Sequence, residues 1–401
     1  MKIWSSFLLC CLLVLLTASA QAVTLSGRAS TVFEWYDTGQ EETATPAYQY
    51  LLFNAKDLWA DGYNFRLYGR LADDLSDEDD VDSRLYYAYL EKKGLIEGLD
   101  FKLGRQFLST TAGASLMDGL YLDYHNLGPL GVRVFGGGDV SYYDSYNAKD
   151  LIDGIELYGN FLDGLRVKFS YLQRWDDTEL ANELFGFSAD YDYADLLNLY
   201  SEVQYNYLND AISYVNLGAN YHRVQQYSVR LEYLYSLPVF TSTSIYSVFA
   251  VDEYQEVLAE LTYHFDQPGL RAFGRYTREI YQDYADANVF EFGLEKIRTE
   301  RFSGYVSGTY RDDEEGQDLT GIKVYGAYLF NEKLRLGAGA HVDVLERRLD
   351  DEDDETTSSR VWADATLYLT KKIDVQAKVE RTESDLWDEY YRGRIRLNVR
   401  F

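Results

Sequence analysis

Most of the chain alternates between apolar and polar residues with a period of two. In 165–171, for example, the odd positions are apolar or aromatic and the even ones are arginine, lysine and serine. A period of two is the period of a β-strand, and no sustained helical period runs through residues 23–401. The alternation therefore predicts an all-β chain whose strands have one apolar and one polar face. Such ladders recur at 63–71, 131–137, 215–221, 227–235, 257–265, 322–330, 334–344 and 373–379.

The connections between these ladders alternate in length. Short turns are predicted at 59–62, 94–98, 128–131, 161–164, 224–226, 266–269, 299–301, 331–333 and 371–372. Longer polar loops are predicted at 38–47, 74–83, 109–117, 138–150, 176–211, 237–254, 282–288, 311–319, 348–360 and 382–389. Strands of about ten residues that are joined by short turns at one end and by long loops at the other are typical of a transmembrane up-and-down barrel. We expect about 20 antiparallel strands, within a range of 18 to 22, because the loop at 176–211 is long enough to hide a further hairpin.

The first 22 residues are set apart from this pattern. Lys2 precedes an apolar run from 7 to 16, and small residues follow at 18–22. This arrangement predicts a cleaved secretory signal peptide at 1–22 and a single exported barrel domain at 23–401. Cys10 and Cys11 both lie within the signal, so the exported chain has no cysteine for a disulfide, a thiolate metal site or a haem attachment.

A soluble β-fold is the structural alternative. Mean hydropathy is −0.34, and no apolar run after the signal is long enough for a transmembrane helix. A search for long apolar runs does not detect a transmembrane β-barrel, because only every second residue of its strands faces lipid. A β-sandwich of this length would usually split into two domains, and a β-helix would show short fixed repeats. Neither sign is present, and the 38 tyrosines suit strands and membrane interfaces.

The final strand carries the most specific signal. The chain ends in YRGRIRLNVRF, with arginines at alternate positions and apolar or aromatic residues between them. This strand resembles the last strand of Gram-negative outer-membrane β-barrels of the porin-like family, apart from Gly393. The resemblance implies an outer-membrane location and recognition by the barrel assembly machinery. The matching residues are Tyr391, Ile395, Leu397, Val399 and Phe401.

A second resemblance lies at LGRQF (103–107) followed by MDGLYLDY (117–124). It is similar to a strand–loop–strand element of porins and related export channels, and implies an architectural or constriction role for Arg105. Arg105 falls on the apolar parity of its strand, so the sequence predicts either a β-bulge there or a place at the rim. A rim arginine that holds loop carboxylates is the alternative role.

The polar parity is rich in cations. A charge in hydrocarbon is costly, so these residues are expected to face the lumen, where basic rings favour anions. The alternative is that the arginines pair with wall and loop carboxylates. The predicted pore-lining residues are Arg66, Arg70, Lys102, Arg133, Arg166, Lys168, Arg174, Arg230, Arg271, Arg275, Arg335, Arg392, Arg394 and Arg396.

The acidic residues behave differently. The formal net charge is −28, and acidic runs lie in the predicted loops at 77–80, 312–315 and 350–355. They suit solvated loop tips, or loop-bound Ca²⁺ or Mg²⁺ beside lipopolysaccharide, although none has EF-hand spacing. The acidity disfavours nucleic acid as a partner. No motif marks a catalytic, cofactor-binding or metal site, so no enzyme activity and no cofactor is expected.

Two functions remain open. The first is a channel that passes small hydrophilic solutes or ions through a basic lumen, with weak anion preference and loop 176–211 as its constriction. The second is a structural sheath around a partner, such as a periplasmic multihaem cytochrome in a conduit across the outer membrane. An open lumen would favour the first and a filled lumen the second.

Overall fold

The computed structural model describes residues 23–38, 42–59, 62–141, 147–223, 226–238, 253–298, 300–314, 318–347, 354–385 and 387–401, without the side chains of 223, 345–347, 354–355 and 387–388. The predicted signal peptide lies outside these residues. No helix in the described ranges is long and apolar enough to cross a membrane. The first strands are β1 (Thr24–Asp37), β2 (Thr43–Ala44), β3 (Pro46–Leu58), β4 (Tyr63–Asp74), β5 (Arg84–Ile96), β6 (Leu99–Thr110), β7 (Gly113–Leu127), β8 (Leu130–Val140), β9 (Leu151–Asn160), β10 (Leu165–Asp176), β11 (Glu179–Tyr193) and β12 (Leu197–Asn206). The remaining strands are β13 (Ala211–Arg223), β14 (Tyr227–Ser236), β15 (Tyr254–His264), β16 (Leu270–Tyr281), β17 (Ala287–Lys296), β18 (Phe302–Asp313), β19 (Leu319–Leu329), β20 (Leu334–Arg347), β21 (Asp354–Tyr368), β22 (Ile373–Ser384) and β23 (Trp387–Arg400).

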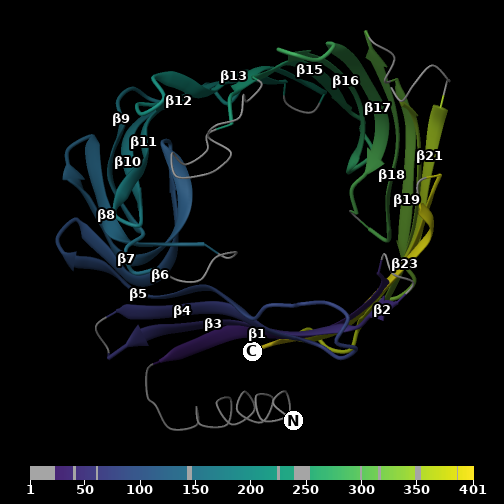
Figure 1. The fold of residues 1–401 in the computed structure, drawn as a ribbon, viewed down its shortest axis with the longest axis horizontal. Coiled ribbons are helices and arrows are strands. Elements are labelled where there is room, and N and C mark those ends of the chain that lie inside the picture. The colour runs from purple at the N-terminus through teal and green to yellow at the C-terminus, as the bar shows by residue number, and fades with distance from the viewer. Residues whose placement is uncertain are drawn as a thin grey trace.

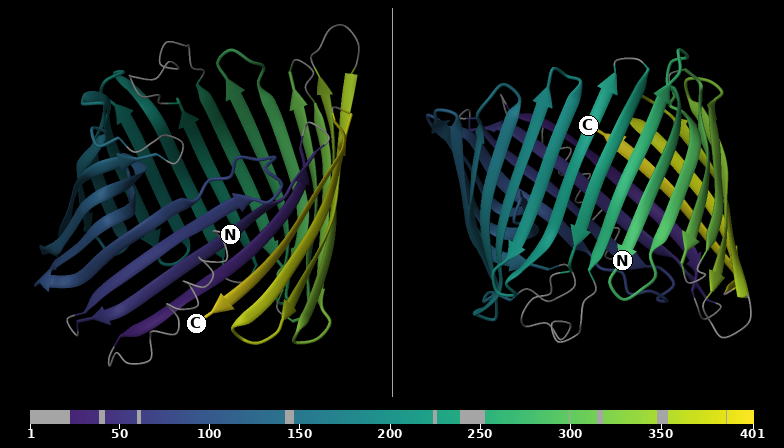
Figure 2. Two further views of the ribbon diagram at one scale, coloured as in Figure 1. Left: turned by 60° about the horizontal axis from the view of Figure 1, so that its bottom comes forward. Right: turned by 90° about the horizontal axis from the view of Figure 1, so that it is seen from above.

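These strands form one closed antiparallel barrel, seen end-on in Figure 1 and from the side, with its strands tilted, in Figure 2. From β3 onward each strand pairs with the next in the chain, and β1 closes the ring between β3 and β23. The short β2 pairs only at the end of β1. In the described ranges the ring has 22 strands, which confirms the predicted fold at the upper limit of its range.

The prediction that 176–211 is a long loop is wrong, and the alternative that it hides a further hairpin, giving 22 strands, is confirmed. This segment contains β11 and β12, which pair with each other and with β10 and β13 over their lengths. The period of two is kept here, as at Leu197, Leu199 and Val203, with the acidic and amide residues mainly on the inner parity. The prediction of a loop at 109–117 is also wrong, because β6 and β7 pair as far as Thr110 and Gly113.

The two faces of the sheet follow the sequence parity through most of the ring. Large apolar side chains of one parity are exposed on the outside, as at Leu231, Leu261, Phe292 and Ile322. Charged side chains of the other parity point inward and bond across neighbouring strands. An outer apolar surface is the surface that lipid would cover, since hydrocarbon offers no hydrogen bonds to polar groups.

The seam between the first and last strands closes the barrel. β1 and β23 pair from Arg28↔Arg400 to Tyr36↔Arg392, and the backbones of Gly27 and Phe401 exchange two hydrogen bonds of 3.1 Å. Gly393 interrupts the apolar ladder because the Trp35 ring covers it, where a Cβ would approach Trp35 Cζ2 to 1.8 Å. The side chains of Tyr391, Ile395 and Leu397 are exposed on the outside. Their role as an assembly signal remains a prediction.

Candidate functional site: the lumen wall

Ion pairs across neighbouring strands dominate the inner face. Arg275 on β16 lies between Glu260 on β15 and Glu291 on β17, with N–O distances of 2.6 and 2.7 Å. The strand register sets this arrangement, because directly paired residues on one face have Cβ atoms only about 5 Å apart. The guanidinium, with its five donors, can therefore bridge two carboxylates at once.

The fourteen predicted pore-lining cations occupy the inner parity of their strands, but most are neutralised there. Nine of them contact a carboxylate, which is the pairing that the sequence left open. Their charge is thus largely cancelled, and the lumen wall is less basic than a list of its cations suggests. The nine are Arg66 with Glu91, Arg133 with Asp123 and Glu156, Arg166 with Asp190 and Asp192, Arg174 with Asp139, Arg230 with Glu232, Arg271 with Glu295, Arg275 with Glu260 and Glu291, Arg335 with Asp364, and Arg392 with Glu34.

The other five predicted cations contact no carboxylate within the described residues. Arg70 lies over the ring of Tyr48, with 5.0 Å to its centroid. Lys102 lies near two tyrosine rings, at 5.0 and 5.7 Å. Cation–π contacts of this kind hold a cation without cancelling its charge. The remaining three are Lys168, Arg394 and Arg396.

Uncompensated positive charge collects at the closing seam. Arg396 Nε donates to Asn398 Oδ1 at 2.9 Å, and its Nη2 donates to Ser30 Oγ at 3.4 Å, so both partners are neutral. Arg394 lies two residues along β23, and Arg28 lies on the same inner parity of β1. In the described ranges, Arg28, Arg394 and Arg396 form no ion pair. We call these three residues the seam arginines; Arg28 is not among the pore-lining cations predicted from the sequence.

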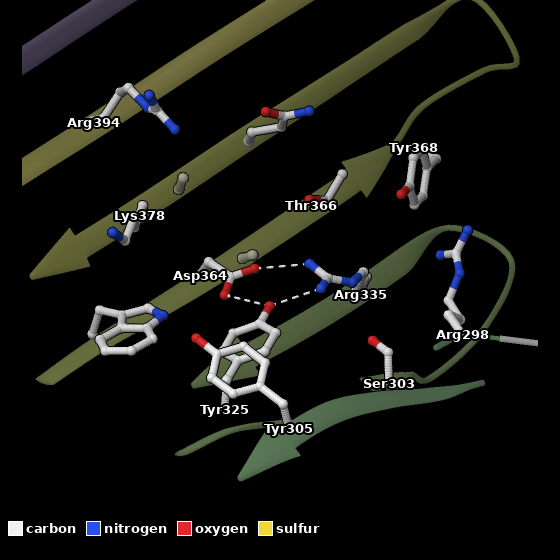
Figure 3. Close-up of a pocket in the computed structure, with 14 residues that line it drawn as sticks. Arg298, Ser303, Tyr305, Tyr325, Arg335, Asp364, Thr366, Tyr368, Lys378 and Arg394 are labelled. Carbon is white, nitrogen blue, oxygen red and sulfur yellow. Dashed lines mark hydrogen bonds and ion pairs between the residues drawn. The ribbon is translucent and has the colours of Figure 1, made fainter. Parts of the chain in front are cut away.

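A cavity of about 670 Å³ is lined by Arg394, one of the seam arginines (Figure 3). Arg335 donates to Asp364 Oδ1 at 2.9 Å and to the Tyr325 hydroxyl at 2.7 Å, while that hydroxyl donates to Asp364 Oδ2. Trp362 is stacked against Tyr325, with 6.2 Å between ring centroids. The cavity thus combines satisfied polar groups, flat aromatic faces and the cationic Arg394.

The opposite side of the lumen wall is covered by the tip of the β6–β7 hairpin. The amide of Thr111, at the tip, donates to Ser170 Oγ on β10 at 3.2 Å, and the two hydroxyls are 2.6 Å apart. Ser170 donates in turn to Glu156 Oε2 at 2.8 Å. Glu156 is only 1% exposed and also accepts from Arg133 at 2.5 Å. This chain of hydrogen bonds ties the hairpin tip to the inner wall.

Apolar packing beneath the hairpin supplements this anchor. Leu108 and Met117 flank the tip, and they pack against Phe135, Ile152 and Leu172 from β8, β9 and β10. All five occupy the inner parity, where the rest of the barrel has mostly polar residues. The inward element is therefore residues 108–117, and the predicted constriction at 176–211 is wrong. Apolar residues on the polar parity were the sequence signal that could have located this cover.

The outer face of the same sector carries charge. Arg105 and Asp118 are register partners on β6 and β7 and form an ion pair of 2.7 Å. They share their face with the exposed Leu103, Phe107 and Leu120. The predicted bulge at Arg105 is absent, since the β6–β7 register runs without a shift, and the predicted rim position is also wrong.

More polar groups lie beside this pair. Asp153 on β9 is exposed between Leu151 and Ile155, and Glu183 on β11 accepts a hydrogen bond from Tyr171 on the outer face. A basic residue on a lipid-facing surface costs about 2–4 kcal/mol at the midplane, and an acidic one somewhat less. An unshielded charged outer face is therefore unfavourable in a bilayer.

Comparisons with known proteins agree with this architecture. No protein-family profile and no curated protein matches the sequence. The Pseudomonas aeruginosa OccK3 (OpdO) structure covers 95% of this chain and 96% of its own, at 11% identity and a TM-score of 0.48. The P. aeruginosa OccK2 (OpdF) structure in complex with glucuronate covers 95% of this chain and 98% of its own, at 9% identity and a TM-score of 0.46. The P pilus usher (PapC) translocation pore covers 94% of this chain and 99% of its own, at 7% identity and a TM-score of 0.52.

At these identities the likeness concerns the fold alone. The chain shares with the PapC translocation pore the fold of a large closed β-barrel.

Proposed function

We propose that the protein is an outer-membrane channel for small hydrophilic solutes or ions. The closed ring supports this proposal, because only helices and closed barrels can satisfy every backbone polar group in hydrocarbon. The exposed outer apolar residues and the polar inner face support it as well. By the usual orientation of such barrels, the end that carries the short turns faces the periplasm.

The feature that carries a preference among solutes is the group of seam arginines. The other wall cations are mostly paired, so net positive charge in the described lumen wall is concentrated beside the cavity at Arg394. Cationic groups at a pore wall lower the energy of a passing anion and raise that of a cation. We therefore expect a modest anion preference, set by a local patch and not by the whole wall.

Reversal potentials in planar bilayers test both parts of the proposal. Purified protein is inserted between two KCl solutions of unequal concentration, and single-channel conductance is recorded. We expect discrete conductance steps and a reversal potential displaced toward the chloride equilibrium potential. Strong cation selectivity would show that the acidic loops determine permeation. Properly inserted barrels that never conduct would contradict the channel itself and favour the sheath.

A further inference from the structure

Three charged residues on the outer face lie close together in one sector of the barrel. The three strands concerned are β6 with Arg105, β7 with Asp118 and β9 with Asp153. They are close neighbours, because only β8 lies between β7 and β9. Arg105 lies six residues from the turn end of its strand at Leu99, and Asp153 lies seven residues from Asn160. With tilted strands, both therefore lie about 15–18 Å above the turn end, inside the apolar belt. Asp153 contacts no cation within the described ranges.

We propose that a second copy of this chain covers the outer face of β6–β9 in a two-fold symmetric dimer. A two-fold axis along the membrane normal, placed between β7 and β8, exchanges left and right and preserves height. It brings Arg105 of each copy opposite Asp153 of the other. The same contact is made twice, as a two-fold interface requires. The proposal rests on the membrane placement of the proposed channel, but not on conduction.

The shape of the surface fits the same axis. Leu120 on β7 is exposed, and its register partner on β8 is Gly136, which has no side chain. Leu120 lies seven residues from Leu127 and Gly136 lies six residues from Leu130, so their heights also match. The axis therefore places Leu120 of one copy over the hollow at Gly136 of the other.

This self-complementarity favours a second copy over other occupants. Lipid would leave Asp153 and the Arg105–Asp118 pair in hydrocarbon, which is unfavourable. An unrelated protein would have to provide its own cation at the height of Asp153. A second copy provides Arg105 there, together with an apolar side chain opposite the hollow.

Thiol crosslinking in outer membranes tests the dimer. A Cβ at position 136 would have Asp153 Cβ as its nearest neighbour, at 3.6 Å, so Gly136→Cys introduces no clash. Position 136 lies beside the axis, so we expect a bifunctional maleimide that spans about 10 Å to join two Gly136→Cys chains into a covalent species of twice the chain mass. The matched control is Val324→Cys, on the exposed outer face of β19, which should remain monomeric. Wild-type protein reports any background from Cys10 and Cys11.

A charge reversal then tests the register of the interface. Asp153→Arg in the Gly136→Cys background places arginine opposite Arg105, and like charges at an interface should reduce the crosslinked fraction about tenfold. Heat-modified gel mobility verifies that the variant barrel is still folded. No crosslink at 136, equal crosslinking at 324, or a product containing a chain of different mass would overturn the proposal. A crosslink that survives Asp153→Arg would also overturn it. Because conductance is not measured here, failure of the dimer leaves the channel proposal standing.

Discussion

The sectors β6–β11 and β14–β20 have the same strand alternation, but β6–β11 departs from it on both faces. In β14–β20 the apolar residues face outward, as at Leu231 and Ile322, while ion pairs such as Arg275–Glu260 face the lumen. In β6–β11 apolar residues such as Leu172 are buried on the inner side beneath the hairpin. Charged residues such as Asp153 appear on the outer side of this sector.

This difference teaches that the alternation determines two faces but not what covers each of them. Where water fills the inner side, wall charges remain solvated and pair with one another. Where the β6–β7 hairpin covers it, the inner side becomes a small protein core with the packing requirements of any other core. The same reasoning applies outside, since a charged face is tolerated only where something other than lipid covers it.

The strongest test of this comparison removes the buried acid under the hairpin. Glu156→Ala removes the buried carboxylate to which both Arg133 and Ser170 donate, and should lower the free energy of unfolding by about 3–5 kcal/mol. Glu295→Ala breaks the more exposed pair with Arg271 and should cost less than about 1 kcal/mol. Urea unfolding in detergent micelles measures both. Equal losses would mean that the hairpin covers nothing.

The sequence predicted the ring well because its evidence is local. Each ladder shows its period without reference to its neighbours, and the terminal Phe401 marks the closing strand. The strand number was predicted as about 20 because the many acidic and amide residues of 176–211, such as Asp190 and Asn198, resemble a loop, although they lie on the inner, polar parity of β11 and β12. Their identity as strands depends on pairing with β10 and β13, which is a tertiary property.

A second test enlarges the apolar core under the hairpin into a cavity. Leu172→Ala removes a side chain that is 1% exposed and should cost about 2–4 kcal/mol. It should also loosen the hairpin tip and raise the fluctuations of single-channel current. Leu231→Ala, on the outer face of β14, should change stability by less than about 1 kcal/mol. If Leu172→Ala changed neither the free energy of unfolding nor the current fluctuations, the hairpin would not form part of a packed core.

The lumen was harder to predict than the ring. Sequence parity predicted both Arg275 and Arg396 as pore-lining cations. In the structure Arg275 lies between two carboxylates, whereas Arg396 contacts only neutral groups. The distinction depends on strand register, which decides whether Glu260 or Asn398 is the neighbour. Register between strands is fixed by the whole ring and cannot be obtained from one strand's pattern.

A third test separates the seam arginines from the paired wall. Arg396→Gln removes one uncompensated charge, and at a separation of about 7 Å in water the change in a passing anion's energy is near RT. The anion-to-cation permeability ratio should therefore fall roughly twofold. Arg396→Lys keeps the charge and should leave the ratio unchanged. If both variants lower the ratio equally, Arg396 acts through its hydrogen bonds to Asn398 and Ser30 and not through charge.

The smallest effect is expected where an ion pair meets solvent at the turn end. Arg166 contacts Asp190 at 2.6 Å, but its side chain is 57% exposed and water competes for both partners. Asp190→Asn should lower the free energy of unfolding by less than about 1 kcal/mol, and high salt should abolish the difference. Unfolding at low and high ionic strength measures this. A large, salt-independent loss would mean that this pair is shielded from water, and that the contrast between the covered sector and the solvated wall extends to the turn end of β10.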